Sequence, residues 1–211
     1  MRSTHPLLYS FRRCPYAMQA RMAIAYAQQT VELREIILKQ KPSSLYKYSP
    51  KATVPVLVLN DGKVIDQSLE IMQWATAKSD PDNWQHNLSE QLCLINKNDF
   101  SFKDKLDKYK YADRHPESEL YYREACYDFL DEIESRLHNN RYLFAAQYCL
   151  ADIAIFPFIR QFAHVDLNWF EDSKWSCTKH WLNYFKSSEL FLSIMHKYPA
   201  WSEHDKPVLF P

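Results

Sequence analysis

The sequence predicts an α/β domain followed by an all-helical domain, and three observations favour this fold class. Segments typical of strands and of helices alternate over residues 1–80. The stretch 78–83 is polar and rich in residues that interrupt regular structure, which marks a boundary. Beyond it, apolar residues recur at helical spacing and no segment has a convincing strand pattern. We therefore expect two domains, over residues 1–78 and 86–211.

The first domain is expected to open with a strand, a helix and a second strand. Residues 5–11 are largely apolar and read as a buried strand. Residues 15–28 carry apolar side chains on one helical stripe, which predicts a helix. Residues 31–35 then alternate between the two faces, as a strand does.

A long loop with at most a short helical turn is expected over the polar residues 38–53. Residues 54–59 form an apolar strand, and Asn60-Asp61-Gly62 is a hairpin signal that leads to a return strand at 64–65. Ser68 is expected to cap a helix that ends near Ala77.

The second domain is expected to contain only helices. Residues 117–138 have an apolar face opposite an acidic one. Residues 150–163 are almost entirely apolar apart from Asp152, so this helix should be central, and Pro157 should kink it. Another helix is expected around Trp181 and Phe185.

Composition excludes several classes of function. Twenty-six basic residues balance 26 acidic ones, so no overall field attracts nucleic acid or an anionic membrane. The single glycine, Gly62, rules out phosphate-binding loops, which need several. Neither a membrane span, nor a secretory signal, nor a metal-binding spacing of Cys or His is expected. Five widely spaced cysteines suggest reduced thiols and a cytoplasmic location.

Cys14 is the candidate nucleophile. It follows the first predicted strand and precedes Pro15, which suits the first position of a helix, so Cys14 should be the N-cap. There the sulfur meets free backbone N–H groups and the positive end of the helix dipole, and Arg12 and Arg13 lie next to it. These conditions favour a thiolate. Ala17 stands where a dithiol protein has its second Cys, so an external thiol must complete any redox cycle.

Four motifs in order resemble those of the glutathione S-transferase superfamily, over nearly the whole chain. Cys14-Pro15-Tyr16-Ala17 looks like a glutaredoxin-type motif, and Thr53-Val54-Pro55-Val56-Leu57 looks like the cis-proline strand of the thioredoxin fold. Gln67-Ser68 resembles the superfamily's acid-or-amide plus Ser pair, and Cys149-Leu150-Ala151-Asp152 its helix-capping segment. The chain is most similar to the cysteine-type members, which are omega-like or glutaredoxin-2-like. The resemblance implies a thioredoxin-like domain, an all-α domain and glutathione as co-substrate.

The resemblance also implies where glutathione binds. A cis Val54–Pro55 bond would present backbone groups of Val54 to the cysteinyl part of glutathione. The helix start at Gln67 and Ser68 would take its γ-glutamyl carboxylate, although many relatives have Glu at the position of Gln67. Lys41 would hold the glutathione backbone or a carboxylate, and Lys39 and Lys51 compete for that role.

The expected function is glutathione-dependent thiol transfer or reduction through a mixed disulfide at Cys14. One alternative is conjugation of glutathione to electrophiles, assisted by the hydroxyl of Ser10 or Tyr9, of which Tyr9 is expected to pack in the core. The other alternative is a non-catalytic adaptor with the same fold. The expected partners are glutathione, a small or glutathionylated second substrate and a second copy of the chain, with no nucleic acid, membrane or metal.

Overall fold

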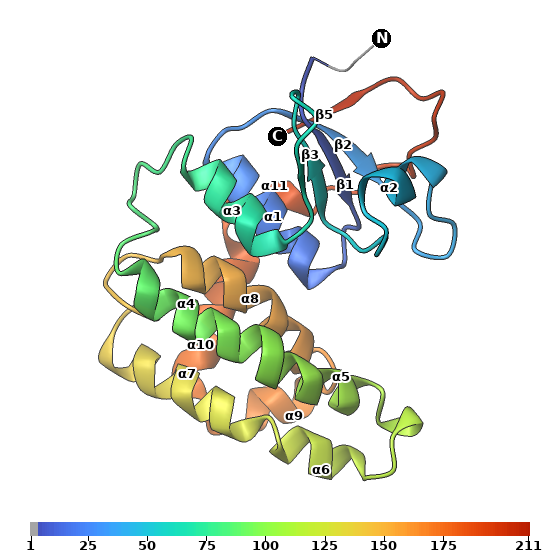
Figure 1. Ribbon diagram of the computed structural model, residues 1–211. Coiled ribbons are helices and arrows are strands. Elements are labelled where there is room, and N and C mark those ends of the chain that lie inside the picture. The colour runs from blue at the N-terminus through green and yellow to red at the C-terminus, as the bar shows by residue number, and fades with distance from the viewer. Residues whose placement is uncertain (1–3) are drawn as a thin grey trace. The chain divides into compact units, whose positions relative to one another are not determined.

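The structure, a computed structural model, describes residues 4–211, which form two compact units (Figure 1). One unit comprises the chain up to Pro81 together with Ser188–Pro211, and the other comprises Asp82–Ser187. Among the described residues no helix has the length and apolar character needed to cross a membrane.

A five-stranded sheet is the centre of the first unit. Its strands are β1 (Leu7–Ser10), β2 (Val31–Glu35), β3 (Val56–Val58), β4 (Val64–Ile65) and β5 (Val208–Phe210), in the spatial order β4-β3-β1-β2-β5. β1 and β2 are parallel, and every other neighbouring pair is antiparallel. The reversal between β3 and β4 is the predicted hairpin, in which Gly62 has a φ of 91° that favours glycine.

Helices cover both faces of this sheet (Figure 1). α1 (Pro15–Tyr26), α3 (Ser68–Thr76) and α11 (Glu189–Ile194) lie on one face, where α1 packs against the other two. α2 (Ser43–Tyr48) lies on the other face and covers an apolar cluster that includes Tyr9, Leu45 and Val56. Because side chains alternate along a strand, Tyr9 points towards α2, while Leu8 and Ser10 point towards α1.

The second unit is entirely helical, as the sequence predicts. Its α-helices are α4 (Leu88–Asn96), α5 (Lys103–Lys110), α6 (Glu119–Glu124), α7 (Tyr127–Asn139), α8 (Leu150–Ala163), α9 (Leu167–Asp172) and α10 (Ser176–Ser187). A π-helical segment, Lys97–Phe102, joins α4 to α5, and a short 3₁₀ turn, Ala112–Arg114, follows α5. α8 runs through Pro157 and is the buried centre of this unit.

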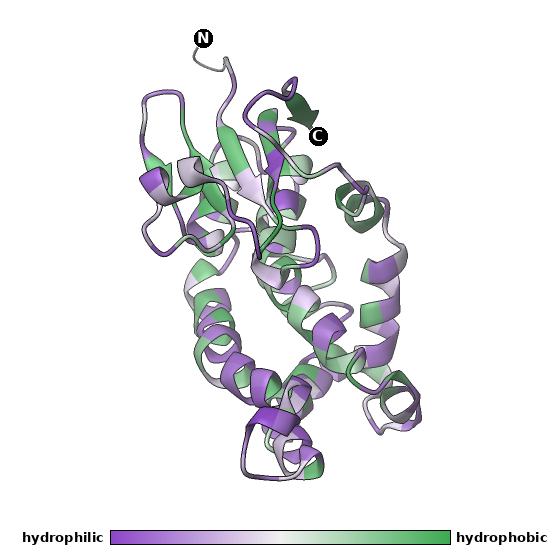
Figure 2. Ribbon diagram, turned by 90° about the vertical axis from the view of Figure 1, so that its right-hand side faces the viewer, coloured by the Kyte–Doolittle hydropathy of each residue, from purple (hydrophilic) through white to green (hydrophobic). Residues whose placement is uncertain are grey.

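The structure corrects three expectations from the sequence. Residues 208–210 form β5, so the expectation of no strand beyond residue 86 is wrong there. The segment from Ser188 onward belongs to the first unit, because α11 packs on α1 and β5 pairs with β2. The helix predicted over 117–138 is divided into α6 and α7 near Ala125. Figure 2 shows β5 beside the C-terminus as a hydrophobic strand, consistent with the 1% exposure of Phe210.

Candidate functional site

Cys14 occupies the predicted position at the start of α1. It is the N-cap residue, with extended φ and ψ of −77° and 123°, and Pro15 opens the helix. The Cys14 N–H donates to the carbonyl of Phe11 at 2.9 Å, which closes a tight turn between β1 and α1. The residue is partly exposed, and it packs against the apolar cluster that includes Tyr9 and Val54.

The Cys14 thiol contacts the segment that precedes β3. Its Sγ donates a hydrogen bond to the carbonyl oxygen of Val54 at 3.5 Å. The Val54–Pro55 peptide bond is cis, which confirms the isomer predicted from the motif. The fold thus joins two sequence-predicted site elements that lie 40 residues apart in the chain.

The start of α3 has no side-chain cap, and its first turn includes the acidic Glu70. Gln67 is the N-cap, with extended backbone, and its side chain does not cap the helix. Ser68 is the first helical residue and is 7% exposed. The first-turn N–H groups therefore receive no hydrogen bond acceptor from Gln67, and such groups favour a carboxylate ligand.

Asp66 is a carboxylate next to Gln67 that the sequence analysis did not single out. It accepts a hydrogen bond from Ser49 Oγ at 3.1 Å and lies 3.7 Å from Lys51 Nζ. Lys51, one of the two alternatives to Lys41 for holding glutathione, therefore forms an ion pair beside the start of α3. Lys41 itself lies just before α2, where it is half-buried and forms no ion pair with any residue between 4 and 211.

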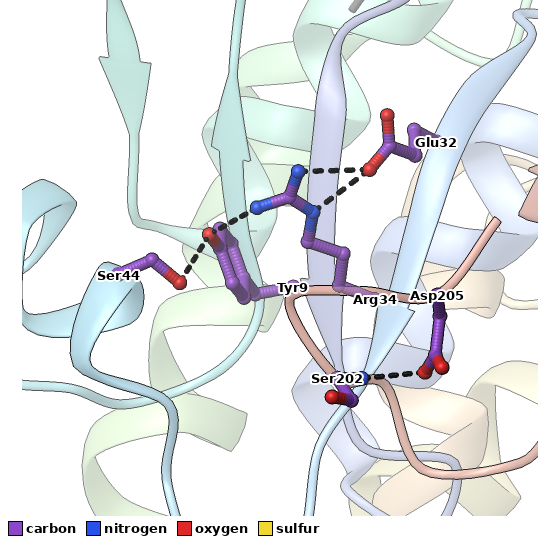
Figure 3. Close-up of polar contacts among 6 residues, drawn as sticks. All are labelled: Tyr9, Glu32, Arg34, Ser44, Ser202 and Asp205. Atoms are coloured by element: carbon purple, nitrogen blue, oxygen red, sulfur yellow. Dashed lines mark hydrogen bonds and ion pairs between the residues drawn. The ribbon is translucent and has the colours of Figure 1, made fainter. Parts of the chain in front are cut away.

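The two hydroxyls proposed for the conjugation alternative are both fully buried. Tyr9 packs under α2, where its hydroxyl donates to Ser44 Oγ at 3.0 Å and accepts from Arg34 Nη1 at 2.8 Å (Figure 3). Arg34 also pairs with Glu32, so Tyr9 belongs to a fixed polar network. Ser10 faces the opposite side of the sheet at 0% exposure. This confirms that Tyr9 is a core residue, and neither hydroxyl is open to a ligand.

A buried charge cluster behind the Cys14 turn is the main feature that the sequence analysis missed. Arg21 of α1 is 0% exposed, and its Nη2 donates to the carbonyl of Arg12 at 2.7 Å. Its Nη1 lies 3.6 Å from Glu35 Oε2, and Glu35 Oε1 accepts the N–H of Arg12 at 2.6 Å. Burial lowers the pKa of Arg21 to about 10, although the negative charges of Glu35 and Cys14 act to raise it. Burial also raises the pKa of Glu35.

The two arginines beside Cys14 in the sequence have other contacts. Arg12 Nη1 donates to the carbonyl of Met195 at 3.4 Å. Arg13 is exposed and its guanidinium lies 5.7 Å from the centre of the Phe11 ring. The one signal for Arg21 in the sequence is its spacing: it lies seven positions after Cys14, which is two helical turns.

The comparisons with known proteins identify the family. Residues 8–83 match the model of the glutathione S-transferase N-terminal domain, and residues 111–204 match that of the C-terminal domain. A probable glutathione transferase from Aplysia californica is 33% identical over 70 residues, which are 33% of this chain and 76% of that protein. The chain belongs to the glutathione S-transferase family.

Solved structures of glutathione S-transferases share the fold at low sequence identity. Glutathione transferase Omega 3C from Trametes versicolor has a TM-score of 0.76 and is 16% identical, over 90% of this chain and 84% of that one. A glutathione transferase from Phanerochaete chrysosporium in complex with oxidized glutathione has a TM-score of 0.75 at 17% identity, over 90% and 94% of the two chains. The predicted thioredoxin-like and helical domains are thereby confirmed. Residues 4–211 contain no group of three or more His, Cys, Asp or Glu that could hold a metal ion.

Proposed function

We propose that this protein is a glutathione-dependent thiol transferase of the cysteine type, similar to the omega-like members, with Cys14 as the nucleophile. The observation that carries the proposal is the placement of the Cys14 thiol. It lies at the start of α1 and in contact with the Val54 carbonyl before a cis-proline. A thiol at this position can attack a sulfur that is held in an extended ligand beside Val54.

The reaction consists of two thiol–disulfide exchanges. The Cys14 thiolate attacks the glutathionyl sulfur of a mixed disulfide, the S–S bond breaks, and the substrate leaves as a thiolate that takes up a proton. A second glutathione thiolate then attacks the disulfide between Cys14 and glutathione. This step releases oxidised glutathione and restores the Cys14 thiolate. One free glutathione is consumed for each mixed disulfide reduced, and the disulfide bond passes from the substrate to oxidised glutathione. Ala17 at the CxxA position leaves this second step to an external thiol.

The binding site that we propose for glutathione uses the residues expected from the sequence. The cysteinyl part pairs with the backbone of Val54 next to Pro55, and the γ-glutamyl carboxylate binds at the start of α3, at Gln67 and Ser68. The uncapped first turn of α3 supports this placement. Lys41 is assigned to the remaining carboxylate. Among the structural neighbours, the Phanerochaete chrysosporium transferase was solved with oxidized glutathione, which fits glutathione as the co-substrate.

Conjugation and adaptor functions are less well supported by the site. Conjugation assisted by Tyr9 or Ser10 requires a hydroxyl that reaches the glutathione sulfur, and both side chains are 0% exposed. A pure adaptor role leaves unexplained a partly exposed cysteine placed at a helix start. None of the five cysteines forms a disulfide within residues 4–211, in keeping with a reducing cytoplasm as the site of action. We assign a homodimer as the working assembly.

Replacement of Cys14 tests the proposal directly. We expect Cys14→Ser to lower the rate of glutathione-dependent reduction of a mixed disulfide between glutathione and 2-mercaptoethanol by at least about a hundredfold, since the covalent step is lost. The matched control is Cys93→Ser, which removes an exposed thiol from the second unit. Mass spectrometry should find one glutathione on Cys14 of the wild type after incubation with oxidised glutathione. Retained turnover in the Cys14 variant would refute the proposal, and retained aryl halide conjugation alone would favour the alternative.

A further inference from the structure

Arg21 holds the turn that presents Cys14. The two residues are seven positions apart, so they lie on the same face of α1 two turns from each other. Helical side chains lean towards the N-terminus, and the long side chain of Arg21 spans this separation. Its Nη2 reaches the carbonyl of Arg12 at 2.7 Å. That carbonyl lies inside the turn that the Cys14 N–H closes onto Phe11, so the guanidinium anchors the turn from behind.

The charge of Arg21 is buried and only partly balanced. Its side chain has no exposure, and within residues 4–211 its Nε and Nη1 make no hydrogen bond. Glu35 is the carboxylate facing it, at 3.6 Å, and the other oxygen of Glu35 is used by the Arg12 N–H. A buried cation is costly unless it is well paired, so stability alone does not account for an arginine here.

We propose that Arg21 is a positioning residue for Cys14. Its guanidinium fixes the 11–14 turn and supplies the positive field that favours the thiolate, and Glu35 sets how much of that field reaches the sulfur. The inference rests on the proposed function only in taking Cys14 as the nucleophile. Arg13 is adjacent to Cys14 in the sequence but is exposed, so water and salt screen its charge and it contributes little to this field.

Four charged or titratable groups act on Arg21. They are Glu35 from β2, Cys14 from the start of α1, Tyr198 from the C-terminal segment and Arg12 from the turn itself. Burial lowers the pKa of Arg21 to about 10, so it remains charged at neutral pH. The Cys14 charge opposes that lowering of the pKa. Because a pairwise interaction is reciprocal, a charged Arg21 stabilises a charged Cys14 to the same extent.

The pH dependence of Cys14 alkylation is the measurement that tests this role. Iodoacetamide reacts with the thiolate, and peptide-resolved mass spectrometry separates Cys14 from the other four cysteines. The rate is followed from pH 5 to 9 on the full chain without glutathione. The variants are Arg21→Met, Arg21→Lys and Glu35→Gln. In the last, the amide oxygen can still accept the Arg12 N–H while the negative charge is gone.

The two charge removals are expected to act in opposite directions. Arg21→Met should slow alkylation at pH 6 about tenfold and move the profile to higher pH, because a nearby cation is lost. Arg21→Lys should recover part of the rate. Glu35→Gln should speed alkylation about threefold at pH values where Glu35 is ionised. Arg13→Met, an exposed arginine beside Cys14, and Glu32→Gln, a buried glutamate on the opposite face of β2, should each leave the profile within about 1.5-fold of the wild type.

Changes of opposite sign in the alkylation rates of Arg21→Met and Glu35→Gln distinguish an electrostatic role from a loosening of the fold. An unchanged profile in the Arg21 variants, or a slower reaction in both Arg21→Met and Glu35→Gln, would overturn the inference. If the Arg21 variants do not fold, Glu35→Gln alone tests the inference. An alkylation rate that does not rise in this variant would contradict the proposed role of Arg21. The proposed function fails separately: a reactive Cys14 thiolate without disulfide reduction would remove the function and leave the role of Arg21 intact.

Discussion

Asp152 is a fully buried carboxylate on which several elements of the helical unit converge. Its Oδ2 accepts from the N–H of Cys149 at 2.9 Å and from the Cys149 thiol at 3.2 Å. Its Oδ1 accepts from the N–H of Leu143 at 3.1 Å and from Trp181 Nε1 at 2.8 Å. Burial raises the pKa of Asp152, although these hydrogen bonds act to lower it. One side chain therefore ties α8 to the preceding loop and to α10.

Removal of this acceptor should be severely destabilising. Asp152→Ala removes the acceptor of four buried donors, which belong to Cys149, Leu143 and Trp181, so we expect the free energy of unfolding to fall by about 3 kcal/mol or more. Urea denaturation of the whole chain measures it. Asp128→Asn, an exposed aspartate in the first turn of α7, is the control and should change stability by less than about 0.5 kcal/mol. Equal losses in the two variants would contradict the structural role of Asp152.

The sequence motif indicated that Cys149-Leu150-Ala151-Asp152 caps a helix start, and Asp152 does accept the N–H of Cys149. The hydrogen bond from the Cys149 thiol to Asp152 has no signal in the sequence. Burial also raises the pKa of Cys149, so this thiol is held protonated, in contrast to the reactivity proposed for Cys14.

At the scale of elements, α10 is capped by a side chain from another helix. Glu134 of α7 accepts the N–H groups of Cys177 at 2.9 Å and Thr178 at 2.8 Å, and the Thr178 hydroxyl at 2.7 Å. Partial burial would raise the pKa of Glu134, but the hydrogen bonds from Cys177 and Thr178 outweigh it and the pKa is lowered. The carboxylate also faces the positive end of the α10 dipole.

Glu134→Gln should therefore have a pH-dependent effect. Because the folded pKa lies below the unfolded value of 4.5, the stabilisation by Glu134 is fully present above that value and disappears as pH falls through the folded pKa. We expect a loss of about 1 kcal/mol at pH 7, after allowing for solvent screening, that shrinks at pH 3. Thermal unfolding at the two pH values measures it. Glu124→Gln, on the exposed surface of α6, should show neither effect, and a loss of equal size at pH 3 and pH 7 would refute the account.

The elements that the sequence predicted best have strong local signals. The hairpin at Gly62, the helix after Pro15 and the buried α8 follow from turn chemistry, helix capping and apolar periodicity. The break between α6 and α7 is short and leaves the apolar stripe nearly continuous, so periodicity could not reveal it. β5 has three residues, too few for a strand pattern, and it is stable as a strand because it pairs with the edge of β2.

In the candidate site, too, the residues that belong to local sequence motifs were predicted and the others were not. The Cys14 position and the cis Val54–Pro55 bond were predictable, because both belong to recognisable local motifs. Arg21 and Glu35 were not, because a charged residue on a helix or strand is usually exposed, and only the packed structure shows that Arg21 is buried and Glu35 largely so. Asp66 was overlooked since its contact with Ser49 joins segments 17 residues apart.

At the scale of the whole molecule, the first unit is built from both ends of the described chain. The C-terminal segment returns from the helical unit, places α11 on α1, and adds β5 to the sheet beside β2. On the way, the Trp201 N–H donates to the carbonyl of Glu35 at 2.8 Å, and the Trp201 ring lies 4.2 Å from the guanidinium carbon of Arg34. The sheet that positions Cys14 therefore depends on residues near the end of the sequence.

A pair of neighbouring substitutions in β5 tests this dependence. Phe210 is 1% exposed and lies opposite Val31 in the register, whereas Leu209 is 51% exposed on the other face. Phe210→Ala opens a cavity under β2 and should lower the free energy of unfolding by about 3 kcal/mol. Leu209→Ala should cost less than about 1 kcal/mol, because most of its side chain is already in water.

Urea denaturation, combined with hydrogen exchange at the amides of Val31 and Leu33, measures both quantities. Phe210→Ala should speed exchange in β2, because the strand pairing across Val31 and Leu33 is weakened. Exchange in α8 should be less affected, because that helix belongs to the other unit. Equal destabilisation by the two substitutions, or unchanged protection of β2 in Phe210→Ala, would mean that β5 is peripheral to the sheet. The expected contrast would show that the C-terminal strand helps to maintain the strand whose end carries Glu35, and through it the surroundings of the Cys14 thiol.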